Sequence, residues 1–240
     1  MSDCRLPVRI GGMQPMTTLD FPGHLSAVLF LQGCPYNCRY CHNQDLIPSQ
    51  RDDVLDSAEV LDMLTERHGF LDAVVFSGGE PTLQDGLADT AAMLSDLGYD
   101  IALHTNGFSP SRLKSVLAGG HIDYVAMDVK ALFDDYEAIT RVPRSGEGTA
   151  RSVDVVIESG VPHEFRTTWH PELVDEQSLL KIAEYVADRG AEAYYVQAFR
   201  ADGCPDEELN SSPLIPAHLS DATRRALKEM FPVFGVRGEK

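Results

Sequence analysis

Six short apolar runs alternate with stretches of helical periodicity along this 240-residue chain. Regular alternation of strand and helix favours a parallel sheet whose strands are joined by helical crossovers. We predict strands at residues 25–32, 72–78, 99–105, 122–129, 162–169 and 192–199. The clearest helical stretches between them are residues 57–69, with Asp56 at the cap, and residues 175–190, ending at Gly190.

Polar residues gather where these strands end. They do so at residues 77–80, 105–107, 128–130, 167–170 and 199–200. Parallel α/β enzymes assemble their sites at the carboxyl ends of the strands, and a complete barrel of this kind has eight strands. The sequence therefore predicts an α/β fold: a partial (β/α)6 TIM-type barrel, open on one side, in a single domain.

The length and the 43% apolar content suit one domain with a sizeable core. Residues 1–24 are expected to be an N-terminal extension made of turns with short extended pieces. Residues 25–204 are expected to form the partial barrel. Residues 205–240 are expected to be an acidic loop followed by a helix over 217–230.

The charge balance excludes several classes of partner. Lys and Arg number 20 and Asp and Glu number 37, which leaves a formal net charge of −17. That charge repels nucleic acid and anionic membrane surfaces. No basic segment followed by an apolar run opens the chain, and no run approaches the ~18 apolar residues of a membrane helix. We expect a cytoplasmic protein without nucleic-acid or membrane partners.

Three of the five cysteines crowd into one loop after the first predicted strand. Cys34, Cys38 and Cys41 have the spacing C-x3-C-x2-C within loop 33–43. Thiolates at this spacing can turn toward one soft metal centre. An iron–sulfur cube with three protein ligands would keep one iron open to an external ligand. The alternative is a structural zinc site completed by His42, Cys4 or Cys204.

The segments at the other strand ends offer groups for a small polar ligand. In VFSGGEP the two glycines permit close approach of the backbone to a ligand, and Glu80 supplies a carboxylate. The same pattern is also typical of a tight turn with no ligand. In VAMDVK, Asp128 and Lys130 share one side of a strand, where they could also form an ordinary ion pair. Arg166, in FRTTW, carries a guanidinium fork suited to a carboxylate.

The cysteine spacing, with aromatic Tyr40 just before the third cysteine, resembles the signature of the radical S-adenosylmethionine superfamily. The resemblance implies a [4Fe–4S] cluster held by the three cysteines, with S-adenosylmethionine (SAM) on its fourth iron. It implies no catalytic residue beyond cluster and cofactor. The implied SAM-binding residues are Tyr40, Ser77, Gly78, Gly79, Glu80, Thr105, Asn106, Asp128, Lys130, Arg166 and Arg200.

Within that superfamily, residues 10–200 are similar to the anaerobic ribonucleoside-triphosphate reductase activating protein family. The opening IGGMQPMTTLDFPGHLSAVLFLQGCPYNCRYCHN and the segments LHTNGF, AMDVK and EFRTTW carry this resemblance. It implies reductive cleavage of SAM to a 5′-deoxyadenosyl radical. That radical would abstract a glycine α-hydrogen from a glycyl radical enzyme, an anaerobic ribonucleotide reductase or a related protein. A low-potential donor such as flavodoxin or ferredoxin would supply the electron.

Two further readings stay open on the sequence. One is a radical SAM enzyme acting on a small molecule, such as a 7-carboxy-7-deazaguanine synthase, and the other is a zinc-stabilised binding module. One position departs from the resembled pattern: His104 stands where related activases usually have an aspartate that helps to hold a monovalent cation, so the resemblance does not extend to a prediction about that ion. Residues 200–210 are a candidate partner-facing segment.

Overall fold

The computed structural model describes residues 5–215 and 218–238, in which eight strands form one sheet in chain order. Strands β2 to β8 run parallel, and β1 pairs antiparallel with β2. The two edges of the sheet, β1 and β8, do not pair with each other, which leaves the barrel open. The strands are β1 (Ile10–Thr17), β2 (Ser26–Leu31), β3 (Ala73–Gly78), β4 (Asp100–Thr105), β5 (Tyr124–Asp128), β6 (His163–Trp169), β7 (Ala193–Ala198) and β8 (Val233–Arg237).

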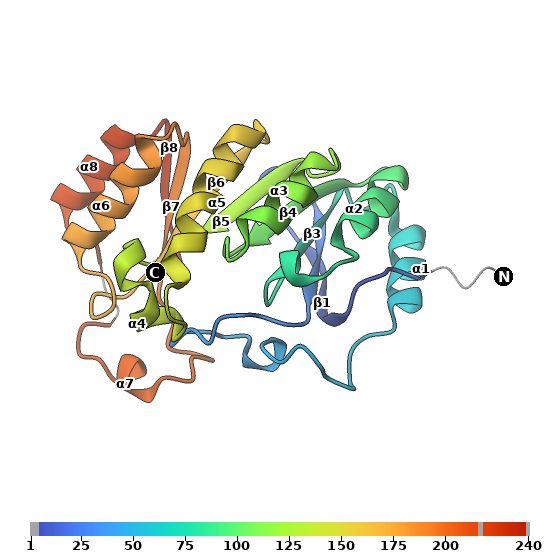
Figure 1. The fold of residues 1–240 in the computed structure, drawn as a ribbon, viewed down its shortest axis with the longest axis horizontal. Coiled ribbons are helices and arrows are strands. Elements are labelled where there is room, and N and C mark those ends of the chain that lie inside the picture. The colour runs from blue at the N-terminus through green and yellow to red at the C-terminus, as the bar shows by residue number, and fades with distance from the viewer. Residues whose placement is uncertain (1–4, 216–217, 239–240) are drawn as a thin grey trace.

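Helices follow the strands along the sheet in chain order, from α1 at the right of Figure 1 to α8 at the left. The short helices α4 and α7 lie at one end of the sheet, together with the loop that follows β2 (Figure 1). Within the described residues, no helix is both long and apolar enough to cross a membrane. The helices are α1 (Ser57–Arg67), α2 (Leu87–Asp96), α3 (Pro110–Ala118), α4 (Tyr136–Thr140), α5 (Ser145–Ser159), α6 (Glu176–Ala187), α7 (Glu207–Asn210) and α8 (Asp221–Met230).

The predicted partial barrel is confirmed, since β2 to β7 correspond to the six predicted strands. Two strands were not predicted. Residues 10–17 form β1 rather than turns with short extended pieces, and the tail ends in β8 after its helix. Asp56 caps α1 as expected, whereas α6 ends at Ala187, before Gly190. The start of the predicted helix over 217–230 lies outside the described residues; α8 begins at Asp221.

Alternate residues of the strands face opposite sides of the sheet. One side carries a large apolar core against the helices, in which Leu103, Met127 and Phe165 are fully buried. The other side begins with a small apolar cluster that includes Ala102 and Phe21. Further along this inner side come charged and polar residues, and these build the site described next.

Candidate active site

A cavity of about 510 Å³ lies at the carboxyl ends of the strands, on the inner side of the sheet. It brings together residues from the loop after β2 and from the ends of β3, β4, β5, β6 and β7. Every predicted site residue except Glu80 lines it. These are Cys34, Cys38, Tyr40, Cys41, Ser77, Gly78, Gly79, Thr105, Asn106, Asp128, Lys130, Arg166 and Arg200.

The cysteine loop is held by backbone hydrogen bonds at both ends. The amides of Gly33 and Cys34 donate to the carbonyls of Leu46 and Ile47 at 2.8 and 3.0 Å, which closes the loop on itself. Farther along, the amide of Arg39 donates 3.0 Å to a carbonyl of α4. The loop therefore presents its cysteine side chains from a braced backbone.

Burial makes two of these thiols, Cys34 and Cys38, poor nucleophiles in the metal-free chain. It raises the pKa of the Cys34 thiol to about 12, and nearby Glu80 and Cys38 contribute in the same direction. Burial also raises the pKa of Cys38. Metal ligands must be thiolates, so a bound metal would have to displace these protons.

The donor set fits a soft multi-iron centre. Within residues 5–215 and 218–238, no three His, Cys, Asp or Glu side chains are gathered closely enough to hold a single metal ion. The three thiols nevertheless line one cavity, as ligands to separate irons of a cluster would. The hydroxyl of Tyr40 is buried there with no hydrogen-bond partner in the described part of the chain, so the cavity wall also has a polar group to offer a ligand.

The two glycines after β3 are required by close backbone packing. Gly78 has φ +113, and a Cβ on it would lie 2.4 Å from the backbone nitrogen of Leu31. A Cβ on Gly79 would lie 2.2 Å from the carbonyl oxygen of Gly33, at the start of the cysteine loop. The end of β3 and the cysteine loop therefore touch backbone to backbone, whereas the sequence analysis expected these glycines to permit close approach to a ligand.

Glu80 lies behind the cavity wall and is fully buried. One carboxylate oxygen accepts from Thr82 and, at 2.7 Å, from the hydroxyl of Thr105. The other accepts from the amide of Asn106 at 2.7 Å. Burial raises the pKa of Glu80, while these donors lower it. Its oxygens are taken up by the protein, so Glu80 holds the ends of β3 and β4 together beneath the residues that line the cavity.

Glu80→Gln should lower the thermal midpoint by about 4–8 °C, corresponding to about 2 kcal/mol, because its amide group would face the Asn106 N–H. The midpoint would be measured by circular dichroism under anaerobic conditions. Glu158→Gln, at an exposed position of α5, is the matched control and should change it by less than about 1 °C. Equal midpoints for the two variants would contradict this account of Glu80.

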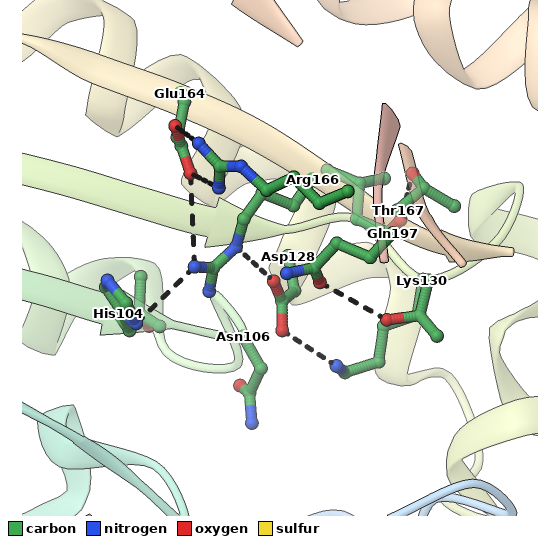
Figure 2. Close-up of polar contacts among 12 residues, drawn as sticks. His104, Asn106, Asp128, Lys130, Glu164, Arg166, Thr167 and Gln197 are labelled. Atoms are coloured by element: carbon green, nitrogen blue, oxygen red, sulfur yellow. Dashed lines mark hydrogen bonds and ion pairs between the residues drawn. The ribbon is translucent and has the colours of Figure 1, made fainter. Parts of the chain in front are cut away.

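Alternating charges cross the inner side of the sheet (Figure 2). Arg237 of β8 makes two hydrogen bonds of 2.6 and 2.7 Å to Glu164, whose carboxylate lies 4.0 Å from the Arg166 guanidinium. Arg166 donates from Nε to Asp128 at 2.9 Å, and Asp128 accepts from Lys130 Nζ at 3.2 Å. These five side chains form a charged row of three cations and two anions. One positive charge is therefore left for an anionic ligand.

The row also sets the protonation of its members. Burial alone would raise the pKa of Asp128, but Arg166 and Lys130 hold it well below its usual range. The charge of Asp128 in turn raises the pKa of Lys130 against the effect of burial. In the described chain no hydrogen bond is made by Arg166 Nη2, and Arg166 lines the cavity, so this nitrogen is a free donor of the row.

Several cavity residues were not predicted from the sequence. They come from the loop between β1 and β2, from β6 and β7, and from β8. The Asp-Phe-Pro-Gly turn was a signal for the first, and the alternating Val-Phe-Gly-Val-Arg pattern was a signal for the last. Those on these elements include Leu19, Asp20, Thr168, Gln197 and Arg237, and further unpredicted lining residues, Tyr36, Asn43 and Ile47, come from the segment after β2.

Residues 200–210, the candidate partner-facing segment, lie against the cysteine loop. Arg39 of that loop donates to Asp206 at 2.7 Å and to Glu208 at 3.0 Å. Cys204 is buried in this segment, with Sγ 3.7 Å from the carbonyl of Arg39, and is not among the residues that line the cavity. Cys4 lies outside the described residues.

Comparison with known proteins identifies relatives along most of the chain. The model of the radical SAM superfamily matches residues 28–186. A protein of Methanocaldococcus jannaschii assigned as a glycyl-radical enzyme activating enzyme is 32% identical over 215 residues, which is 85% of each chain. The pyruvate formate-lyase-activating enzyme of Clostridium pasteurianum is 33% identical over 144 residues, covering 58% of this chain and 59% of that enzyme.

Solved structures share the fold at low sequence identity. A domain of pyruvate-formate lyase-activating enzyme from Bacteroides vulgatus has a TM-score of 0.54 at 18% identity, covering 69% of this chain and 99% of that one. SuiB of Streptococcus suis bound to S-adenosylmethionine has a TM-score of 0.61 at 13% identity, covering 86% of this chain and 48% of that one. These neighbours share the partial-barrel architecture described above.

Proposed function

Since the chain belongs to the radical SAM superfamily, we propose that it activates a glycyl radical enzyme by abstracting hydrogen from a glycine α-carbon. The observation that carries the proposal is that three cysteines and the charged row, which has a net positive charge, line the same cavity. The two relatives described above are both named as activating enzymes, which supports a protein substrate over a small molecule.

In this proposal Cys34, Cys38 and Cys41 each ligate one iron of a [4Fe–4S] cluster, and SAM binds the fourth iron. When bound, the two groups supply the electron and the 5′-deoxyadenosyl group that takes the hydrogen atom. The side chains around them hold the reactants in position. Arg166 Nη2 is the donor for the methionine carboxylate, and Asp128 with Lys130 fixes the Arg166 guanidinium.

The remaining predicted contacts fall into two groups. Ser77, Gly78 and Gly79 line the cavity and offer backbone groups to the ligand, and the two glycines also let the end of β3 pack directly on the backbone of Leu31 and Gly33. Tyr40, Thr105 and Asn106 bring an aromatic ring and hydrogen-bonding groups to the cavity wall, and Arg200 lies at its exposed rim. Glu80 acts through the backbone that it holds, without a direct contact to the cofactor.

We propose an anaerobic ribonucleotide reductase, or a related glycyl radical enzyme, as the partner. The open side of the sheet provides the route by which a flexible glycine loop would reach the cavity. Glycine suits this target because it has no side chain to block close approach. Flavodoxin or ferredoxin is the proposed electron donor.

The test is anaerobic reconstitution with iron and sulfide, followed by reduction and incubation with SAM and a candidate reductase from the same host. We expect about four irons per chain, release of 5′-deoxyadenosine, and a glycine-centred radical detected by electron paramagnetic resonance. The control is the same reductase with its target glycine replaced by alanine, which should give no such signal.

Two results would contradict the proposal at different levels. Cleavage of SAM without a radical on any glycyl radical enzyme of the host would remove the activase function and leave a small-molecule substrate. A colourless protein with one zinc per chain would remove the radical chemistry altogether.

A further inference from the structure

His104 is a buried histidine at the centre of the inner side of the sheet, and no role has been given to it above. It lies near the end of β4, is 8% exposed, and has a hydrogen-bonding partner on each ring nitrogen. Nε2 is 2.8 Å from the backbone carbonyl of Asp20, and Nδ1 is 3.4 Å from Arg166 Nη1. The ring therefore bridges a loop and the charged row (Figure 2 shows the Arg166 side).

The partners determine the tautomer. A carbonyl oxygen only accepts, so Nε2 carries the proton that is donated to Asp20. A guanidinium only donates, so Nδ1 is the acceptor for Arg166. Burial and the positive charge of Arg166 lower the pKa of His104 to about 3, which keeps the ring neutral at physiological pH. Only the neutral Nε2–H form satisfies both contacts.

On one side the imidazole restrains Arg166. Asp128 accepts from Nε of that guanidinium, and His104 accepts from Nη1 on its other edge. Two acceptors in different directions prevent the planar group from rotating. Its free Nη2 then keeps one orientation toward the cavity.

On the other side the imidazole holds the loop between β1 and β2. The carboxylate of Asp20 accepts from Thr17 at 2.8 Å, and the amide of His24 donates to the carbonyl of Phe21 at 3.1 Å. Phe21 packs into the inner apolar cluster, whereas Leu19 is 84% exposed and lines the cavity. The His104 contact fixes the part of this loop that forms the cavity wall.

We propose that His104 is a positioning residue that couples the cavity-lining loop at Leu19 and Asp20 to the guanidinium of Arg166. One ring thereby orients both the group assigned to the SAM carboxylate and the wall next to the incoming glycine loop. The inference rests on the proposed function for the identity of the ligand at Arg166. The coupling itself is a property of this chain and can be measured without a partner.

Three substitutions separate the two contacts. Asn places its amide oxygen near the position of Nδ1, so His104→Asn keeps the acceptor for Arg166 and loses the bond to Asp20. Gln places its amide nitrogen near the position of Nε2, so His104→Gln keeps the bond to Asp20 and loses the acceptor. His104→Phe removes both and preserves the size of the ring.

Two readouts are compared on the cluster-loaded protein: the dissociation constant of SAM, and amide hydrogen exchange at Leu19 and His24. His104→Gln should weaken SAM binding about tenfold with exchange unchanged. His104→Asn should speed exchange about tenfold with SAM affinity within about twofold of wild type. His104→Phe should show both changes.

Val156→Ala is the control for general destabilisation, because it creates a cavity in the core beneath α5, away from the site. It should lower the thermal midpoint and leave both readouts unchanged. If the Asn and Gln variants instead lose affinity and protection equally, in proportion to their thermal midpoints, His104 is merely structural and the proposal is overturned. Wild-type values in all three His104 variants would overturn it as well.

Arg166→Gln separates this inference from the proposed function. We expect at least a tenfold loss of SAM affinity with iron content retained. Wild-type affinity in that variant would overturn the assignment of Arg166 to SAM. It would also overturn the inference that His104 affects SAM affinity through Arg166. The hydrogen-exchange data on His104→Asn would still decide whether His104 holds the loop at Leu19 and Asp20.

Discussion

Replacing any one of Cys34, Cys38 and Cys41 with alanine is expected to reduce SAM cleavage to background and to remove most of the iron. Each thiol lines the cavity from a short loop whose backbone is braced by hydrogen bonds, so each has a fixed place around the proposed cluster. A cluster that loses one of three protein ligands also loses the geometry that leaves a single iron open for the cofactor. The loss should therefore be complete for each cysteine.

The measurements are iron and sulfide content after anaerobic reconstitution and the yield of 5′-deoxyadenosine after reduction. Cys204→Ala is the matched control, because Cys204 is also buried and lies against the same loop without lining the cavity. It should retain about four irons per chain and the wild-type yield. Cleavage of SAM by any of the three cavity variants, or its loss in the control, would show that the ligands are misassigned.

The sequence predicted the strands that are buried on both faces and missed those at the edges. The inner strands are continuous apolar runs, such as residues 25–32 and 72–78, because parallel strands lie between two layers. β1 contains Gly11, Gly12 and Pro15, which are turn signals in sequence. It tolerates them because it lies at the edge of the sheet, where β2 is its one neighbouring strand among the described residues.

β8 was missed for a tertiary reason. Its central Gly235 weakens the strand signal, yet a Cβ there would lie 2.9 Å from the ring of Tyr195 on β7. The guanidinium of Arg237 stacks 3.6 Å above that same ring. The residues of β8 suit a strand because they pack on an aromatic ring of β7. Such a contact between two elements cannot be identified from the local sequence pattern.

The sequence indicated which residues lie together at the candidate site, but it did not indicate where their side chains point. Strand ends meet at one edge of a parallel sheet, so Asp128, Lys130 and Arg166 could be placed together from spacing alone. The sequence could not show that Glu80 points behind the wall, or that His104 finds a partner 84 residues away in Asp20. Those features depend on which donors the fold brings near each side chain.

Asp128→Asn should lower the free energy of unfolding at pH 7 by about 3 kcal/mol, since it leaves Arg166 and Lys130 buried without their shared anion. We expect the lower end of the range for a broken buried ion pair because the Asp128 side chain is 26% exposed. The measurement is urea unfolding of the cluster-free chain. Asp123→Asn is the matched control: its carboxylate accepts one backbone amide, which Asn can also do, and the change should be below about 0.5 kcal/mol.

The pH dependence of that difference tests the cause. The two cations hold the pKa of Asp128 below its usual range despite burial, so its charge stabilises the folded state above the ordinary aspartate pKa of about 3.9. This contribution is lost as pH falls through the folded pKa, whereas Asn cannot titrate. The gap between wild type and Asp128→Asn should thus stay constant from pH 7 to about pH 5 and shrink by about 1 kcal/mol by pH 3. A gap that is unaffected by acid would mean that lost packing, rather than the charge of Asp128, destabilises the variant.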